Sequence, residues 1–246
     1  MPAAPPTDRK SLGYLDFPRP MTTVDIVTFA IRDEALHVLL VRRGTEPEEP
    51  FPGLWALPGG FVDVARDATL ADCALRKLSE KTGVASPYLE QLASFGSADR
   101  DPRGWSATHV YVVLIDARRA ETIAADARWF PLVGSGLDDA VKPKLAFDHA
   151  MILNVAITRL RNKVEYTSLP LYLMPAEFTL PELQRVYEIV LDRPLEKSAF
   201  RTRMLSADAI EPVARTRKGP NRPAQLYRLR RAAAPTYFAR TFKPPG

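Results

Sequence analysis

The sequence contains few of the residues that form disulfides and metal centres. Its 246 residues include a single cysteine, Cys73, and only three histidines. One cysteine excludes an internal disulfide and a zinc site with cysteine ligands. Because His37, His109 and His149 lie far apart in the chain, we interpret them as structural residues and expect no histidine-rich metal site.

Long apolar segments are also missing. The longest apolar runs, such as residues 110–115, are far shorter than the roughly 20 residues of a membrane-spanning helix. The first residues, MPAAPPTDRK, contain no apolar core of the signal-peptide type. We therefore expect a cytoplasmic protein without a membrane partner.

Acidic residues are scarce towards the C-terminus. Residues 197–246 hold 12 Lys and Arg against two Asp and Glu, a net charge of +10, whereas residues 1–164 hold 20 against 21. Positive charge gathered in one region is typical of a segment that binds a polyanion. A solvated basic tail is the alternative interpretation.

Proline is frequent, by contrast, and marks the ends of the chain. Many of the 23 prolines lie near the two termini or in loops, which favours flexible tails. We expect tails at residues 1–20 and 233–246. Because the pattern of the chain changes near residue 165, we place one domain at 21–164 and a second at 165–232.

The first domain shows the patterns of both strands and helices. β-Branched and aromatic residues predict strands at 23–31 and 36–43, joined as a hairpin by a polar turn. Apolar residues at helical spacing predict helices at 69–81 and 145–161. Further strand-like segments lie at 54–64 (around a Pro-Gly-Gly turn), 89–96, 109–117 and 127–132.

The second domain has a different order of elements. Thr179 and Glu182 form a capping-box pattern that begins a helix, and a tight turn ends it. A short basic helix is predicted at about 195–205. Residues 211–230 favour two strands around a Gly-Pro-Asn turn at 219–221. Helix, turn, helix and basic hairpin, in this order, are typical of a winged helix-turn-helix.

One motif of the first domain resembles a known family. Pro58-Gly59-Gly60, followed by a helix with Arg76, Glu80 and Gly83, resembles the Nudix box. The sequences around Arg43, at 100–105 and at 145–149 are similar to the ADP-ribose branch of that family. The resemblance implies an α/β protein with the α+β Nudix fold, in which helices flank a mixed sheet.

The box departs from the family at the residues that hold a metal. In Nudix enzymes, glutamates on one helix face hold Mg²⁺ against a pyrophosphate. Here that face carries Lys77, Glu80 and Lys81, and Arg66 stands where an upstream glutamate is expected. This face repels a cation and attracts a diphosphate. We expect no cofactor, with Mg²⁺ needed only if residual hydrolase activity exists; the carboxylates left as partial substitutes are Asp63, Asp67 and Asp72.

The resemblance implies that this domain senses ADP-ribose or a related NAD-derived nucleotide. Arginines suit bidentate contacts with phosphate, and Phe61 or Trp105 is suited to stack on an adenine. We assign no catalytic residue, and interpret Arg76 as a tie between the box loop and its helix, and Cys73 as core. The expected ligand-binding residues are Arg43, Gly60, Lys77, Glu80, Lys81, Arg100 and Arg103.

The basic residues of the second domain are expected to contact DNA. If Leu195, Phe200 and Met204 face the core, the basic residues of that helix face outward. The hairpin then brings further basic residues to phosphates or to a minor groove. The expected DNA-binding residues are Lys197, Arg201, Arg203, Arg215, Arg217, Lys218 and Arg222. A surface that only aids solubility is the alternative.

Residues 178–188, 194–203 and 222–227 are similar to the winged helix of Nudix-related transcriptional regulators of NAD metabolism. The chain departs from that family at Ala199, where asparagine is common, and in its interrupted run of basic residues. The resemblance implies a homodimeric repressor with two partners, a double-stranded DNA operator and a small-molecule effector such as ADP-ribose. Two alternatives stay open: a Mg²⁺-dependent ADP-ribose pyrophosphatase with an accessory domain, and a module that binds RNA or a protein.

Overall fold

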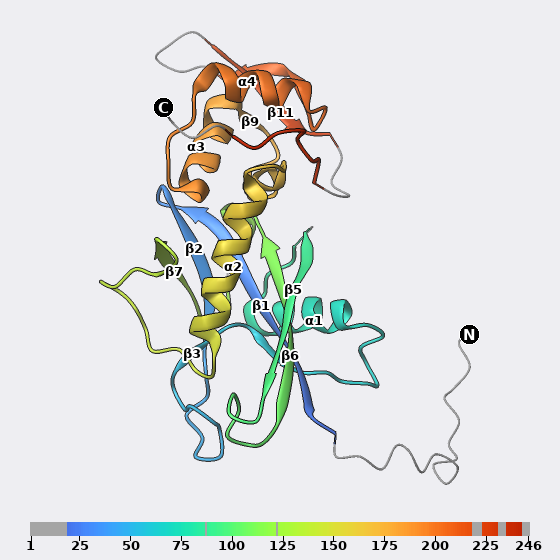
Figure 1. The fold of residues 1–246 in the computed structure, drawn as a ribbon, viewed down its shortest axis with the longest axis vertical. Helices are drawn as coiled ribbons and strands as arrows, with labels where there is room; N and C mark the ends of the chain where they lie inside the picture. The colour runs from blue at the N-terminus through green and yellow to red at the C-terminus, as the bar shows by residue number, and fades with distance from the viewer. Residues whose placement is uncertain (1–18, 87, 122, 218–222, 231–234, 243–246) are drawn as a thin grey trace, which may run out of the picture.

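The chain folds as a mixed sheet with helices on its faces and a smaller winged-helix unit at one end of the sheet (Figure 1). This confirms the fold class expected from the sequence. The computed structural model describes residues 19–86, 88–121, 123–217, 223–230 and 235–242. Among these described residues, none of the helices combines the length and the apolarity that crossing a bilayer requires.

The sheet is organised around β1 (Met21–Arg32). This strand pairs in parallel with β6 (Ser106–Leu114) and antiparallel with β2 (Ala35–Arg42). Because side chains alternate between the faces of a strand, Ile26 packs in the cluster below α1 and Val27 packs in the cluster below α2. Both faces of β1 are therefore buried, which explains its almost continuous apolar sequence.

The remaining strands extend the sheet on both sides of β1. The strand order is β5-β6-β1-β2-β7-β8, with β3 paired to β2 and β4 paired to β1. Strand β6 begins and ends three residues earlier than the predicted 109–117. It begins earlier because Ser106 already pairs with Met21 and Ser97, and it ends before residues 117–120, which form the short 3₁₀ helix η3 (Ala117–Ala120). The other strands are β3 (Trp55–Ala56), β4 (Gly59–Phe61), β5 (Leu89–Ser97), β7 (Ala127–Val133) and β8 (Gly136–Leu137).

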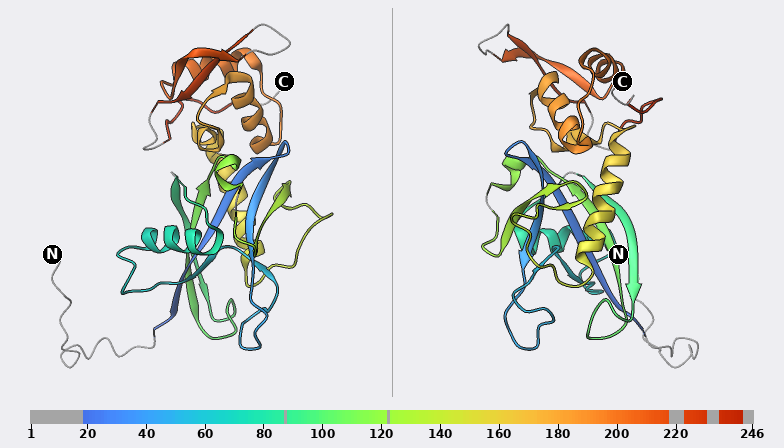
Figure 2. Two further views of the ribbon diagram at one scale, coloured as in Figure 1. Left: turned by 180° about the vertical axis from the view of Figure 1, so that it is seen from behind. Right: turned by 60° about the vertical axis from the view of Figure 1, so that its left-hand side comes forward.

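Helices α1 (Leu70–Thr82) and α2 (His149–Val164) cover opposite faces of the sheet (Figure 2). Helix α1 has the predicted bounds within one residue, because the Thr69 hydroxyl accepts from the Asp72 amide and Gly83 ends the helix with a φ of 73°. Helix α2 begins four residues later than predicted. Phe147 has a positive φ of 53°, which is outside the range of a right-handed helix, so residues 145–147 cannot be part of α2.

The winged-helix unit has the predicted order of elements. Helix α3 (Leu180–Leu191) begins with a complete capping box, in which the Thr179 hydroxyl accepts from the Glu182 amide and the Glu182 carboxylate accepts from the Thr179 amide. A three-stranded sheet of order β10-β11-β9 completes the unit. Its elements are β9 (Phe178–Thr179), α4 (Lys197–Ser206), β10 (Ile210–Arg217) and β11 (Ala224–Leu229). The predicted turn at 219–221 lies outside the described residues.

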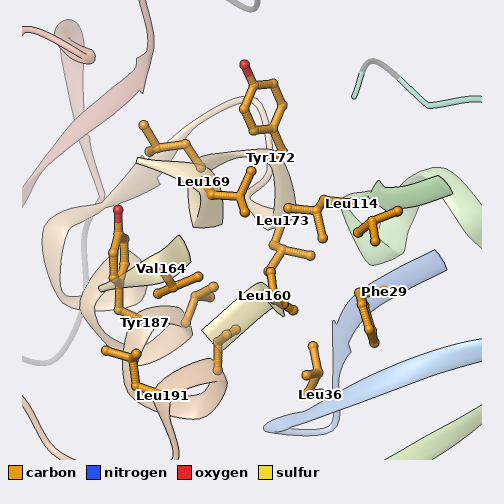
Figure 3. Close-up of a cluster of buried hydrophobic side chains, with 14 of the residues drawn as sticks. Phe29, Leu36, Leu114, Leu160, Val164, Leu169, Tyr172, Leu173, Tyr187 and Leu191 are labelled. Atoms are coloured by element: carbon orange, nitrogen blue, oxygen red, sulfur yellow. The ribbon is translucent and has the colours of Figure 1, made fainter. Parts of the chain in front are cut away.

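The two units share one hydrophobic core (Figure 3). The C-terminal half of α2 and the 3₁₀ helix η4 (Leu169–Leu173) lie between the sheet and α3. Leu160 and Leu173, both almost completely buried, belong to the same cluster as Phe29 of the sheet and Tyr187 of α3. Burial of this kind joins the units by a packed interior and not by a flexible linker.

The C-terminal residues pack against this unit. We name residues 235–242 the strap. From the sequence we expect them in a flexible tail, but Phe242 is 7% exposed and lies against the rings of Tyr187 and Phe200. Phe242 is buried and Phe238 is partly buried, whereas Tyr237 is exposed, so the strap is held by two of its three aromatic residues, a signal that the prolines nearby conceal. Of the expected N-terminal tail, residues 1–18 lie outside the described residues.

Because the core is continuous, we expect the substitution Leu160→Ala to destabilise the whole chain. The cavity it leaves should lower the free energy of unfolding by about 2–5 kcal/mol. Leu75→Ala on the exposed side of α1 is the matched control and should change it little. Urea unfolding followed by circular dichroism measures both; a loss below about 1 kcal/mol for Leu160→Ala would contradict a core shared by the two units.

Candidate functional site

A polar cleft of about 530 Å³ opens between α1, the strands β1 to β4, and four loops. The loops are the segment after β2, the segment between β5 and β6, the segment before β7, and the turn before α2. All seven residues predicted to bind a ligand line this one cleft, although they come from four separate parts of the sequence: Arg43, Gly60, Lys77, Glu80, Lys81, Arg100 and Arg103. The fold therefore brings together the set that the sequence analysis assembled from motifs.

The Nudix-like box is held by a buried ion pair. The Arg76 guanidinium donates to the Asp67 carboxylate at 2.7 and 2.5 Å, and Asp67 is only 1% exposed. These hydrogen bonds hold the pKa of Asp67 well below its ordinary value. Arg76 also donates to Glu80 at 3.0 Å. It thus ties the box loop to the helix, as the sequence predicts, and Asp67 is engaged by Arg76 instead of facing the cleft.

The helix face towards the cleft is positive. The carboxylate of Glu80 accepts from Arg76 and, at 2.9 Å, from Arg66, so its charge is compensated within the protein. Within the described part of the chain, no hydrogen bond or ion pair joins the ammonium group of Lys77 or Lys81 to another residue. Two uncompensated ammonium groups therefore face the space in which a Nudix enzyme holds a metal ion and a diphosphate.

Gly60 makes room for one of these lysines. Its φ of 148° is strained for any residue with a side chain, and a Cβ placed there would lie 3.2 Å from both Cε and Nζ of Lys77. A residue with a side chain at position 60 would therefore be strained in its backbone and would press against the end of the Lys77 side chain.

The floor of the cleft is a buried network of charges. The Arg100 guanidinium donates to both oxygens of Asp148, at 3.0 and 2.9 Å, and lies 3.6 Å from Asp25. The Asp25 carboxylate accepts from the Thr108 hydroxyl at 2.7 Å and lies 3.6 Å from His149 Nε2. Burial alone would raise the pKa of Asp25, but His149, Thr108 and Arg100 together hold it below its ordinary value.

The structure adds residues that the sequence analysis did not assign to the site. His149, there interpreted as a structural residue, lines the cleft and accepts from the Leu57 amide at 2.9 Å through Nδ1. Asp25 lines the cleft from the middle of β1. A carboxylate within an otherwise apolar strand was the available signal for Asp25, because an unpaired charge is costly to bury.

Aromatic rings and arginines meet at the rim of the cleft. The Arg43 guanidinium lies 4.8 Å from the Phe147 ring and forms an ion pair with Glu49, and Arg103 lies 4.9 Å from the Phe61 ring. Of the two rings considered for an adenine, Phe61 lines the cleft and is 42% exposed. Trp105 is exposed but is not part of the lining.

Cys73 has the environment of a core residue. It is fully buried on the inner face of α1, and burial raises the pKa of its thiol to about 11. Such a thiol is almost entirely protonated at neutral pH and is a poor nucleophile. This agrees with its interpretation as core.

The basic residues of the winged-helix unit divide into two groups. Lys197 and Arg201 are exposed on α4, while Phe200 and Met204 point into the core as predicted. Arg203 differs from the prediction, because its guanidinium turns towards the strap and does not face outward. On β10, Arg215 and Arg217 are exposed and form ion pairs with Glu177 and Glu182, and the remaining predicted residues, Lys218 and Arg222, lie outside the described residues.

No group of three or more His, Cys, Asp or Glu side chains within the described ranges is arranged to hold a metal ion. In the cleft, the carboxylates of Glu49, Glu80 and Asp101 each form an ion pair with an arginine. The donor set of the cleft is therefore suited to an anion with several phosphate oxygens more than to a divalent cation.

Two family models match the chain. Residues 21–149 match the model described as NUDIX domain, and residues 170–229 match the model described as NrtR DNA-binding winged helix domain. Together they cover the sheet with α1 and the winged-helix unit, while α2 after its first residue lies between the two matches. The strap lies beyond both matches.

Known proteins with both units are similar to this chain. The ADPR responsive transcriptional repressor NtrR of Acinetobacter baylyi is 47% identical over 214 residues, which cover 87% of this chain and 84% of that protein. The structure of Shewanella oneidensis NrtR complexed with a 27mer DNA matches 90% of this chain and 99% of that chain, at 40% identity and a TM-score of 0.82. The NUDIX domain of the same Shewanella protein, complexed with ADP ribose, matches 58% of this chain and 90% of that chain, at 42% identity and a TM-score of 0.50.

The buried ion pair of the box predicts a pH dependence. Because folding lowers the pKa of Asp67 from its ordinary value of 3.8, the pair stabilises the fold at pH values above about 4, and this stabilisation is lost as the pH falls below that value. We expect Asp67→Asn to be less stable at neutral pH and to lose less stability between pH 5 and about pH 2. Thermal unfolding at a series of pH values measures this, with Asp139→Asn, at an exposed carboxylate, as the control. Parallel pH profiles for Asp67→Asn and the wild type would contradict the assignment.

Proposed function

The chain belongs to the family of NrtR-type regulators, in which a NUDIX domain is joined to a winged helix domain, and on this premise we propose that it is a transcriptional repressor that binds operator DNA and responds to ADP-ribose. The observation that carries the proposal is the cleft itself. The helix face that holds a metal in Nudix enzymes presents Lys77 and Lys81 without an ion-pair or hydrogen-bond partner among the residues that the structure describes. The same chain carries exposed basic residues on a winged helix.

The proposed binding mode uses the positive groups of the cleft for the diphosphate. Lys77 and Lys81 supply charge from α1, and Arg43 and Arg103 supply planar guanidinium groups from the loops at the rim. Phe61, exposed beside Arg103, is the proposed stacking surface for the adenine. Because the two ammonium groups occupy the place of a cation, we propose that binding requires no metal ion or other cofactor.

The regulatory step is a linkage between two binding equilibria. A nucleotide that prefers one arrangement of the two units shifts the chain towards that arrangement and thereby changes its affinity for DNA. Bound DNA then changes the affinity for the nucleotide by the same factor. We further propose that the repressor acts as a homodimer in the cytoplasm, because winged helices and their relatives commonly read paired half-sites.

The first test is a gel-shift titration on the DNA upstream of the protein's own gene. We expect the protein to retard this duplex, ADP-ribose to release it, and EDTA to leave the release unchanged. Binding should weaken as the salt concentration rises, because phosphate contacts release counterions. A chain that binds no duplex, or binds structured RNA in preference, would overturn the proposal.

Arg103 provides a sharper test of the cleft. Its substitution by alanine removes a charge-assisted contact, which should raise the Kd for ADP-ribose by about 10- to 100-fold, corresponding to roughly 1.5–3 kcal/mol. The affinity for DNA in the absence of ADP-ribose should stay unchanged. Isothermal titration calorimetry measures the first quantity, with Arg118→Ala, an exposed and ion-paired arginine outside the cleft lining, as the control. Equal nucleotide affinity for Arg103→Ala and the wild type would remove Arg103 from the binding mode.

Residual hydrolysis is the alternative function, and one observation favours it. Glu80 keeps a carboxylate on the helix face that binds Mg²⁺ in the enzymes, and it lines the cleft. We expect no cleavage of ADP-ribose by the wild type in Mg²⁺, since Arg66 and Arg76 neutralise this carboxylate. A turnover that disappears in Glu80→Gln would establish the enzyme instead. The double substitution Lys77→Glu and Lys81→Glu is the matched variant in which the metal-binding face is restored.

A further inference from the structure

The strap crosses from the end of α2 to the face of α4. At its beginning it lies antiparallel to the linker that follows α2: the Ser168 amide donates to the Thr236 carbonyl at 2.9 Å, and the Thr236 amide donates to the Ser168 hydroxyl at 2.8 Å. The Phe238 amide donates to the Tyr166 carbonyl at 2.7 Å. These three hydrogen bonds fix the strap to the linker in a single register.

At its other end the strap is joined to α4 through Arg203. The guanidinium lies 3.8 Å from the centre of the Phe242 ring and 5.4 Å from that of Phe238, and it donates to the Thr241 carbonyl at 2.8 Å. A guanidinium stacked on an aromatic ring is attracted by the ring's electron-rich face. Phe242 in turn packs on Phe200, the core residue of α4.

Arg203 is therefore turned towards the strap and is half-buried. Burial lowers the pKa of its guanidinium, and its Nη1 is buried with no acceptor within hydrogen-bond distance among the described residues. Lys197 and Arg201, on the same helix, are exposed. A basic residue whose guanidinium is turned towards the protein does not contact a phosphate of bound DNA. Because burying a charge is costly, another role has to account for this arrangement.

We propose that the strap, residues 235–242, is a positioning element that couples the nucleotide cleft to the DNA-binding helix, with Arg203 as the positioning residue on α4. The proposal rests on the proposed function, because it assumes that ADP-ribose changes the affinity for DNA. It assigns a role to a segment that lies beyond both family matches.

Helix α2 supplies the connection between the strap and the cleft. Its 16 residues span about 24 Å at 1.5 Å per residue. At the N-terminal end, Asp148 and His149 belong to the charge network on the cleft floor. At the C-terminal end, the Thr167 hydroxyl donates to the Lys163 carbonyl at 2.6 Å, next to the linker residues that bind the strap. A displacement of α2 by a bound nucleotide is therefore passed to the strap and, through Arg203, to α4.

The first experiment compares two variants of one helix, Arg203→Met and Arg201→Met. Each substitution removes one positive charge and keeps an unbranched side chain. The two positions are two residues apart on the same helix. The slope of log affinity for operator DNA against log salt should become shallower by about 0.9 for Arg201→Met, because a phosphate contact is lost. It should stay unchanged for Arg203→Met, although the affinity falls. A slope change of the same size for Arg203→Met would show that Arg203 contacts DNA and would overturn the proposal.

The second experiment measures the coupling itself in the full chain. The ratio of operator Kd with and without saturating ADP-ribose is determined for the wild type, for the two strap variants Arg203→Met and Phe242→Leu, and for the surface control Arg201→Met. Phe242→Leu keeps an apolar side chain in the core. We expect a ratio of about 5- to 150-fold in the wild type and a fall of this ratio by at least about fivefold in both variants, with the Kd for ADP-ribose unchanged in the absence of DNA. Phe242→Leu serves as the second variant should Arg203→Met fail to fold, which circular dichroism shows.

The outcomes separate the two proposals. If the wild type shows no effect of ADP-ribose on DNA affinity, the proposed function fails. If the wild type responds and a folded variant keeps the full ratio, the strap does not carry the coupling and this inference fails. Loss of the ratio in both variants, but not in the surface control Arg201→Met, supports it.

Discussion

The structure depends on the burial of one helix against two units. The first half of α2 lies on the sheet, and its second half, together with η4, lies between the sheet and α3. Hydrophobic burial is non-directional, but packing at the density of a protein interior allows only a few arrangements of rigid elements. The cleft and the winged-helix unit are thus joined by packed elements, which is the connection on which the proposed coupling depends.

The chemistry of the cleft follows from what is paired and what is not. Each arginine that reaches the lining from the loops has a carboxylate partner nearby, whereas the two lysines of α1 have none among the described residues. An arriving diphosphate therefore meets positive charge that the protein has not already neutralised.

Much of this could be predicted from the sequence, because many of the signals are local. The capping box at Thr179, the glycine that ends α1 and the Asp33-Glu34 turn, in which both residues have positive φ, are each encoded by neighbouring residues. The cleft residues could be predicted because they belong to short motifs, and the resemblance to the Nudix family indicates that these motifs form one site. The role of His149, the inward turn of Arg203 and the packing of the strap depend on contacts between segments distant in the sequence, and no local pattern contains them.

The residues that hold the box together are different from those that face the cleft, and this has a consequence for the evolution of such a protein. The buried Arg76–Asp67 pair keeps the box in shape whatever residues face the cleft, so the face itself is free to vary. Three substitutions, at Arg66, Lys77 and Lys81, separate the ammonium-lined face from the carboxylate-lined site of the enzymes, and none of them has to disturb the core. A sensor of this kind lies only a short mutational path away from a hydrolase of the same fold. Selection on the identity of Lys77 and Lys81, rather than on stability, would then keep the sensor distinct from the hydrolase.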